Sequence, residues 1–524
     1  MKSTNKNKLL FSIIAAIGMF MLGYGQEKLD IKVLYVGYSP EISMPENLES
    51  IRVTGGMTPE RFKKEYGKRM PAFKELLNTY FTIVKTVDAR DYKEEMSLGY
   101  LTIFDQVPKQ IRERVVYNDP ETGEFIGMEP AKYVSDNFSS PAIFIGHTAP
   151  VIGSGLGSKL DWYCLCLDRY AHHIKTEHDI FNGPFKTDIT LIERPTPKGV
   201  LEAFDGFDVP KEIPMWEVDK EGYEDGKGFR VGLVSRGWGF EDSPNAEIIS
   251  SGVCTKQKTA VALGRHGNFF LWGFAGSPEY MTEEAKKVFA NVIVYTNKHA
   301  NDKMIAKKYN ERIATKVYID ELLFYTTKPS YLSYVEFYKK VNEKNAKLKE
   351  AAIQKQKAGE ELTKMDKVII NAKPEPIASR EGYLKESIGR NSWSKITGLD
   401  TLAIREYLKE NRDYFYSEPS GFYDLKVDKD VKSLGIANTN IKVLDKAIGM
   451  LERKQDVDKA YRILMRYTLE SFKSPKDWRT WFNKYKDDMF FTESGGYVWM
   501  INSLDANPKT KPRSEKEISE LKYL

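Results

Sequence analysis

The sequence predicts an α/β domain followed by a helical region. Apolar runs rich in β-branched residues alternate with helical segments between residues 31 and 298, which is the pattern of strands joined by helices. Strand patterns become rare after His299, where charged and amphipathic helical segments take over. Because the strands are nearly continuous apolar runs, we expect a buried, mostly parallel sheet flanked by helices, followed by an all-α C-terminal region.

Seven apolar runs are the expected strands of the first domain. The first is IKVLYVGY (31–38), and Thr58-Pro59 then predicts a helix start, since Thr caps a helix and Pro fits its first turn. A final amphipathic helix is expected over 282–299. The other six strands are expected at 81–87, 101–107, 141–147, 230–236, 259–265 and 268–274.

The N-terminus has the pattern of a secretory signal peptide. The basic segment MKSTNKNK precedes the apolar run LLFSIIAAIGMFMLGYG, and the small residues Gly23 and Gly25 fit a cleavage site. We therefore expect export to the periplasm or the extracellular space, with a mature chain that begins at Gln26; a retained anchor is the alternative. No later stretch is apolar for long enough to cross a bilayer.

Length and composition predict a multidomain globular protein. A chain of 524 residues is too long for one core, and we expect an α/β domain over 26–300, a charged helical arm and linker over 301–377, and a helical domain over 378–524. The 79 basic and 74 acidic residues give a net charge of only +5, which predicts no nucleic-acid partner. Three cysteines provide no disulfide framework, so the core must supply the stability.

The C-terminal region contains an internal echo. DYFYSEPSGF (413–422) matches DMFFTESGGY (488–497) at a constant offset, with Asp, aromatic, Ser/Thr, Glu and Gly in the same order. Two amphipathic helical segments lie between them. This pattern predicts two imperfect repeats of helix pairs, each ending in an aromatic turn, although chance similarity is the alternative.

Three phrases of the first domain resemble one known family. The domain begins with IKVLYVGY, carries EHDIFNGPF (177–185), and ends with FFLWGF (269–274), GSP and the final helix. Together they resemble the ThuA-like (trehalose-utilisation) branch of the class I glutamine amidotransferase-like superfamily, over residues 31–299. The resemblance implies a flavodoxin-like fold and an association with sugar metabolism, and it attaches no activity to the helical C-terminal half.

The superfamily's nucleophile is missing from this chain. Glutamine amidotransferases carry a Cys at a tight strand-to-helix turn, G-x-C-x-G, whereas the equivalent turn FIGHTAP (144–150) has His147. Cys164 and Cys166 lie in an apolar stretch, 158–168, that we interpret as helical, where they are expected to be buried and inert. We therefore expect no glutaminase activity.

The ends of the expected strands supply the candidate acids and bases. Functional groups of parallel sheets gather at the carboxyl ends of the strands. Asp105 and Gln106 lie at the end of the third strand, and His147 lies at the end of the fourth. Asp105 and His147 are the acid/base candidates, with His178 in support, because a His near its ordinary pKa transfers protons around neutral pH. Gln106 is a candidate for substrate binding.

A second strand end offers substrate-binding residues. SRGWGF (235–240) contains Ser235, Arg236 and Trp238. Arg suits a carboxylate or phosphate, and Trp suits the face of a sugar. Turn chemistry at Asp242-Ser243-Pro244 is an equal alternative for the end of this segment. The Gly-rich IGSGLGS (152–158) predicts a tight turn between a strand and a helix, with weak support for anion binding.

Three of the chain's six histidines lie at 172, 173 and 178. His173 and Glu177 stand four residues apart and His178 follows, but no two of these histidines have the spacing of a zinc peptidase motif. A structural role for the His172–His178 cluster is favoured. A divalent metal site made of His173, Glu177 and His178 is the outsider, and no cofactor is predicted.

Two functions remain open at this stage. The first is an exported enzyme acting on a carbohydrate or sugar derivative by hydrolysis or other acid/base chemistry. The alternative is a non-catalytic binding or scaffold protein, with a pseudo-enzyme α/β domain and a helical half that contacts a protein partner or a glycan. A metallohydrolase using the His172–His178 cluster is the outsider.

Overall fold

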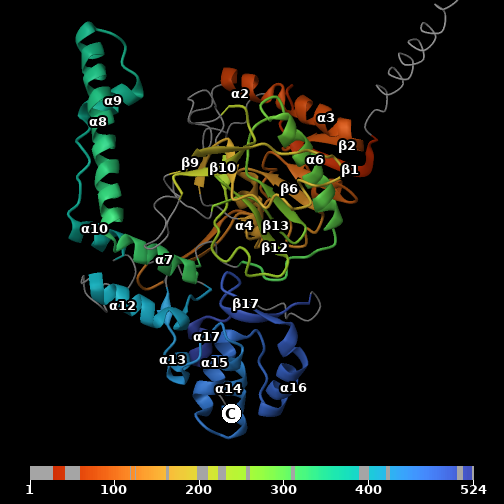
Figure 1. The fold of residues 1–524 in the computed structure, drawn as a ribbon, viewed down its shortest axis with the longest axis vertical. Helices are drawn as coiled ribbons and strands as arrows, with labels where there is room; N and C mark the ends of the chain where they lie inside the picture. Colours follow the sequence, from red (N-terminus) through yellow and green to blue (C-terminus); the bar gives the residue numbers. More distant parts are fainter. Residues whose placement is uncertain are drawn as a thin grey trace, which may run out of the picture.

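The computed structural model contains a ten-stranded mixed sheet followed by a mostly helical region (Figure 1). It describes residues 27–41, 59–118, 120–123, 125–160, 164–197, 210–221, 232–254, 260–308, 313–388, 401–419, 425–503 and 512–521. The expected signal peptide at 1–25 and the expected helix cap at Thr58 lie outside this part of the chain. No helix within the described residues is long and apolar enough to span a bilayer.

The sheet has the strand order β2-β1-β3-β6-β14-β13-β12-β8-β10-β9. The first five strands pair in parallel: β1 (Leu29–Gly37), β2 (Phe81–Asp88), β3 (Leu101–Phe104), β6 (Ala142–Ile145) and β14 (Phe269–Trp272). The others pair antiparallel: β8 (Tyr170–His172), β9 (Leu191–Pro195), β10 (Glu212–Glu217), β12 (Ala246–Gly252) and β13 (Val261–His266). Counted along the chain, the parallel strands follow the flavodoxin-like order 2-1-3-4-5. The predicted α/β fold class is therefore confirmed.

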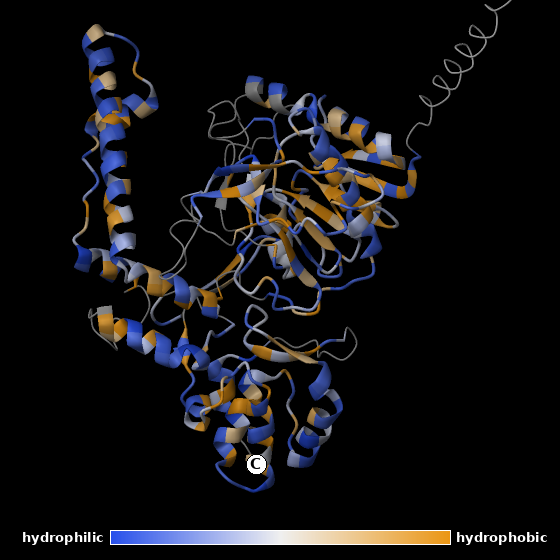
Figure 2. Cartoon of the chain, viewed as in Figure 1, coloured by the Kyte–Doolittle hydropathy of each residue, from blue (hydrophilic) through white to orange (hydrophobic). Residues whose placement is uncertain are grey.

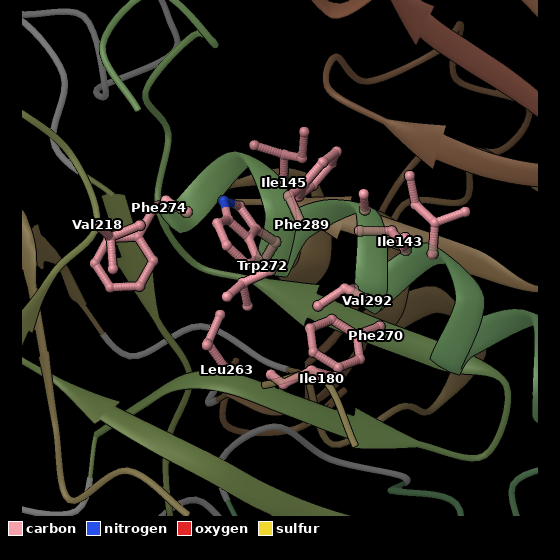
Figure 3. Close-up of a cluster of buried hydrophobic side chains, with 14 of the residues drawn as sticks. Ile143, Ile145, Ile180, Val218, Leu263, Phe270, Trp272, Phe274, Phe289 and Val292 are labelled. Carbon is pink, nitrogen blue, oxygen red and sulfur yellow. The ribbon is translucent and has the colours of Figure 1, made fainter. Parts of the chain in front are cut away.

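Helices cover both faces of the parallel strands, because those strands are apolar on both faces. Helices α3 (Arg69–Tyr80) and α6 (Glu283–Lys298) pack on the face that carries Val33 and Tyr35. Helices α2 (Pro59–Tyr66) and α4 (Thr148–Leu156) pack on the face that carries Leu34 and Val36. Figure 3 shows the first core, in which Trp272 and Phe270 of β14 meet Phe289 and Val292 of α6. Figure 2 shows hydrophobic residues along the strands of the sheet, whereas the surrounding helices carry both hydrophobic and hydrophilic residues.

Two local predictions in the first domain are wrong. In the segment that we expected to be helical, residues 164–167 instead form β7 (Cys164–Leu167), which pairs with β11 (Gly232–Val234). A short apolar run such as CLCL fits a buried strand as well as a buried helix. The Gly-rich segment 152–158 is not a loop before a helix but the end of α4, which stops at the left-handed Gly157. The sequence pattern also missed the hairpin of β4 (Val115–Asn118) and β5 (Phe125–Glu129).

The charged segment after the α/β domain folds as helices. Helix α7 (Lys316–Tyr325) leads into α8 (Lys328–Ala358), which begins at the capping residue Thr327 and ends at the left-handed Gly359. Helix α9 (Lys364–Asn371) folds back against α8 and starts with a capping box at Thr363. A return segment then reaches α10 (Arg380–Ser387). Figure 1 shows α8 and α9 standing away from the rest of the molecule.

The echo in the sequence corresponds to a repeated unit of structure. Helix α12 (Thr401–Asn411) continues through a 3-10 turn into the hairpin β15 (Phe415–Tyr416) and β16 (Lys426–Val427). Helix α16 (Pro475–Tyr485) does the same into β17 (Met489–Thr492) and β18 (Val498–Ile501). The aromatic turns are thus two short hairpins within a helical region. Its other helices are α13 (Lys429–Leu434), α14 (Lys442–Glu452), α15 (Val457–Tyr467) and α17 (Glu515–Glu520).

The turn of the second hairpin joins the two regions. Asp242 of the α/β domain accepts hydrogen bonds from Thr492 Oγ1 at 2.9 Å and from Ser494 N at 2.8 Å. The same carboxylate pairs with the ammonium of Lys159, whose side chain is only 1% exposed. A second hydrogen bond runs from Lys159 Nζ to Gly239 O at 2.7 Å. We call Lys159, Asp242, Thr492 and Ser494 the domain joint.

We expect Asp242→Ala to lower the free energy of unfolding by about 3 kcal/mol, because it leaves the buried Lys159 ammonium without its carboxylate. Urea denaturation followed by circular dichroism measures the change. Glu283→Gln is the matched control, since Glu283 is 77% exposed and its ion pair with Lys286 is worth at most about 1 kcal/mol. Equal losses in both variants would contradict a structural role for the domain joint.

Candidate functional site

The carboxyl edge of the parallel strands is the candidate site. In a sheet of order 2-1-3-4-5 the chain leaves β1 and β3 in opposite directions, and a crevice forms between their carboxyl ends. Asp105 and Gln106 directly follow β3, and both are almost completely buried. Their backbone N–H groups donate to Val36 O of β1 at 2.9 and 3.1 Å. The expected site residues after the third strand are therefore at the switch point, below the surface.

A buried ion pair occupies this position. Arg69, the first residue of α3, donates from Nε to Asp105 Oδ2 at 2.7 Å and from Nη2 to Oδ1. The side chains of Arg69 and Asp105 are 2% and 1% exposed. Tyr35 Oη of β1 donates to the same carboxylate at 2.6 Å. Asp105 is thus an ionised acceptor of several hydrogen bonds, which is a poor state for a general acid.

The surroundings hold Arg69 and Tyr35 in place. Arg69 Nη1 donates to Ala275 O, after β14, at 2.9 Å, and the guanidinium lies 5.2 Å from the ring of Phe73. The ring of Tyr35 stacks on Phe73 and lies so close to Gly37 that a Cβ there would be 2.5 Å from it. Burial lowers the pKa of Arg69, but the Asp105 carboxylate outweighs burial, so this pKa lies above its ordinary value.

His147 lies at the same edge of the sheet. It follows β6, the neighbour of β3, and immediately precedes α4. Gly146 takes a positive φ of 53°, which makes the turn between strand and helix sharp. Thr148 Oγ1 donates to Phe104 O at 2.8 Å and ties the start of α4 to the end of β3. His147 is half-buried. The structure therefore brings His147 and Asp105 to one edge, on adjacent strands.

The three expected substrate-binding residues of SRGWGF lie against other parts of the chain. Ser235 is fully buried, and its Oγ donates to Lys159 O at 3.0 Å. Trp238 is 4% exposed; its Nε1 donates to Glu321 Oε1 of α7 at 2.8 Å, and its ring lies 5.0 Å from that of Tyr318. The guanidinium of Arg236 lies 4.1 Å from the Trp238 ring. This segment makes the contact with α7 and offers no open aromatic face.

His178 lies at the opposite edge of the sheet. Its Nε2 is 3.4 Å from Glu247 Oε2, and Glu247 pairs across strands with Arg265, beside the amino end of β14. Arg265 Nε donates to Glu247 Oε1 at 2.6 Å, and Tyr295 Oη donates to the same oxygen. Burial raises the pKa of Glu247, but hydrogen bonds from His178 and Tyr295 and the charge of Arg265 lower it to about 2. His178 therefore does not join His147 and Asp105.

The remaining histidines of the cluster have a structural environment. His172 is fully buried in β8, and its Nε2 donates to Gly252 O at 3.0 Å, since a carbonyl only accepts. Its Nδ1 then accepts from His173 Nδ1 at 2.7 Å. Burial and the neighbouring His173 lower the pKa of His172 to about 4. Within the described ranges, no group of three or more His, Cys, Asp or Glu side chains is placed to hold a metal ion.

The sequence analysis missed the residues that dominate this edge. Arg69 and Tyr35 were not candidates, because neither follows a strand. One signal was present: Arg69 stands at helical spacing with Tyr66, Phe73 and Tyr80, on the buried face of a helix. A charge at such a position requires a buried partner.

Comparison of the chain with protein-family models, with curated proteins and with solved structures gave no match.

We expect Asp105→Asn to lower the free energy of unfolding by about 3–5 kcal/mol, because it leaves the Arg69 charge buried without a counterion. Chemical denaturation measures this loss. Asp445→Asn is the matched control: Asp445 is 56% exposed beside Arg479, and its replacement should cost at most about 1 kcal/mol. A stable Asp105→Asn variant would show that Asp105 has no structural role at this edge.

We also expect stability to fall between pH 6.5 and pH 4 through His172. In this window the imidazole of His172 binds a proton in the unfolded chain, whereas in the folded chain the same imidazole stays neutral until the pH nears 4. Stability is therefore fully present above pH 6.5 and decreases as the pH falls, by up to about 3 kcal/mol. The free energy of unfolding, measured by denaturation at several pH values, should fall less steeply with decreasing pH in His172→Gln than in the unchanged chain. Parallel pH profiles for the two proteins would contradict this assignment.

Proposed function

We propose that this chain is an exported, non-catalytic binding protein with a ThuA-like α/β domain. The observation that supports this proposal is the buried Arg69–Asp105 pair at the switch point, where a ligand crevice is expected in this fold. An acid that accepts from a guanidinium and a phenol hydroxyl is held as a carboxylate. It has no proton to donate near neutral pH, so half of the expected acid/base pair is committed to structure.

The distribution of the other candidates supports the same proposal. Ser235 and Trp238 take part in packing beside Lys159 and α7, and His178 lies at the opposite edge with Glu247. A catalytic site needs its acid, base and binding groups within reach of one substrate. The expected set does not converge in this way, whereas a binding protein needs no acid or base within reach of its ligand.

The ligand class that we propose is a carbohydrate or a sugar derivative, with the helical C-terminal half as the contact for a protein partner. This part rests on the resemblance of residues 31–299 to ThuA-like proteins and on the signal-peptide pattern at 1–25. A second candidate function is an acid/base enzyme of the same ligand class. The position of His147, after a sharp turn at a helix start, is the observation that favours it.

One experiment separates the two functions. The chain from Gln26 onward is screened by thermal shift against a panel of oligosaccharides, and each mixture is then analysed for products by chromatography. We expect a ligand that raises the melting temperature and is recovered intact, with the shift unchanged in His147→Ala. Formation of a product that is lost in His147→Ala would instead establish the enzyme. A panel without any shift would remove carbohydrate from the proposal.

A further inference from the structure

The arm formed by α8 and α9, residues 328–373, concentrates the charge of the protein. It contains eleven lysines, no arginine and six acidic residues, a surplus of five positive charges. The rest of the chain then holds 68 basic and 68 acidic residues. The net charge of the whole protein is therefore the net charge of the arm, which projects from the body (Figure 1).

Most of the lysines near the far end of the arm face solvent. Lys355 pairs with Asp366 at 3.3 Å, and this ion pair holds α9 against α8. Lys357, Lys364 and Lys367 are exposed, and none of them forms an ion pair with another described residue. The surplus charge is thus available to a partner and is not used to fold the arm.

Exposed apolar side chains also lie on the arm. On α9, Met365 is 69% exposed and Val368 is 66% exposed, one helical turn apart, and no residue of α9 is buried. On α8, Phe337 is 60% exposed and Leu348 is 46% exposed. Figure 2 shows apolar bands on an otherwise hydrophilic arm. Leaving such side chains in water is unfavourable, and a cover of low polarity would remove that cost.

We propose that the arm docks onto the surface of an anionic lipid bilayer. Lysines attract an anionic lipid surface, and apolar side chains between them enter the boundary between headgroups and acyl chains. A soluble polyanion would satisfy the lysines but would leave Met365 and Val368 exposed. Helix α8, with 31 residues and a length of about 46 Å, would hold the α/β domain at a distance from the bilayer.

The test uses the chain from Gln26 to Leu524, which holds every described residue and lacks the apolar leader. Its binding to vesicles of phosphatidylcholine, with and without phosphatidylglycerol, is measured by co-sedimentation. We expect binding only to the vesicles that contain phosphatidylglycerol, with weaker binding at high salt because salt screens the lysines. Binding that does not depend on phosphatidylglycerol, or no binding to either vesicle, would overturn the proposal.

Two variants test the two parts of the surface. Replacing Lys357, Lys364 and Lys367 by Gln should weaken vesicle binding at least tenfold. The double replacement Met365→Ser and Val368→Ser should weaken it about tenfold, since both apolar contacts are lost. The matched control replaces Lys473 and Lys476, two exposed lysines of the helical domain, by Gln, and should bind as the unchanged chain does.

The partner class follows from the same variants. Circular dichroism and thermal melting of each variant establish that the arm and the body remain folded. If the serine variant binds vesicles as well as the unchanged chain, and heparin binds both equally, the partner is a soluble polyanion and the lipid proposal fails. Loss of vesicle binding in both arm variants, but not in the control, is the result that the proposal requires.

Discussion

The ion pair between Arg69 and Asp105 joins four parts of the chain at one point. Asp105 ends β3, Arg69 starts α3, and Tyr35 of β1 donates to the same carboxylate. Through Ala275 O the guanidinium also holds the segment after β14. Desolvation of two charges is expensive, so such a pair persists only when every donor and acceptor is placed correctly. The carboxyl edge of the sheet is therefore held in one arrangement.

The same rigidity limits the chemistry of this edge. A carboxylate that already accepts these hydrogen bonds is poorly suited to take up and release a proton during a reaction. Trp238 and Asp242 are likewise committed, to α7 and to the second hairpin, which attach the helical region to the α/β domain. Polar residues that could have formed an open site hold the two regions together. We therefore expect ligands or partners to bind at surfaces whose side chains take no part in packing or in joining the two regions.

Periodicity predicted the parallel part of the sheet and the helical character of the C-terminal region, but not the antiparallel strands β8, β9, β10 and β12, and little of the candidate site. The apolar runs gave the parallel strands and the final helix, because burial on both faces imposes a local pattern. Asp105 and His147 reached the expected edge, because strand ends are a property of local sequence. The partner of Asp105 lies 36 residues earlier, at Arg69, and the contact of Trp238 with Glu321 spans 83 residues. Such pairings depend on tertiary packing, which no local pattern encodes.

Net charge gave no sign of the arm for a related reason, since it averages over regions that the fold separates. Helix α8 buries only Ser330 and Ala352, so propensity, capping and local pairs such as Glu336–Lys340 must stabilise it. Those pairs need equal numbers of lysines and acids, and like charges beyond that number destabilise a helix. Five surplus lysines therefore oppose the stability of the arm. A helix that carries them, beside exposed Met365 and Val368, is better suited to an anionic, partly apolar surface than to water alone.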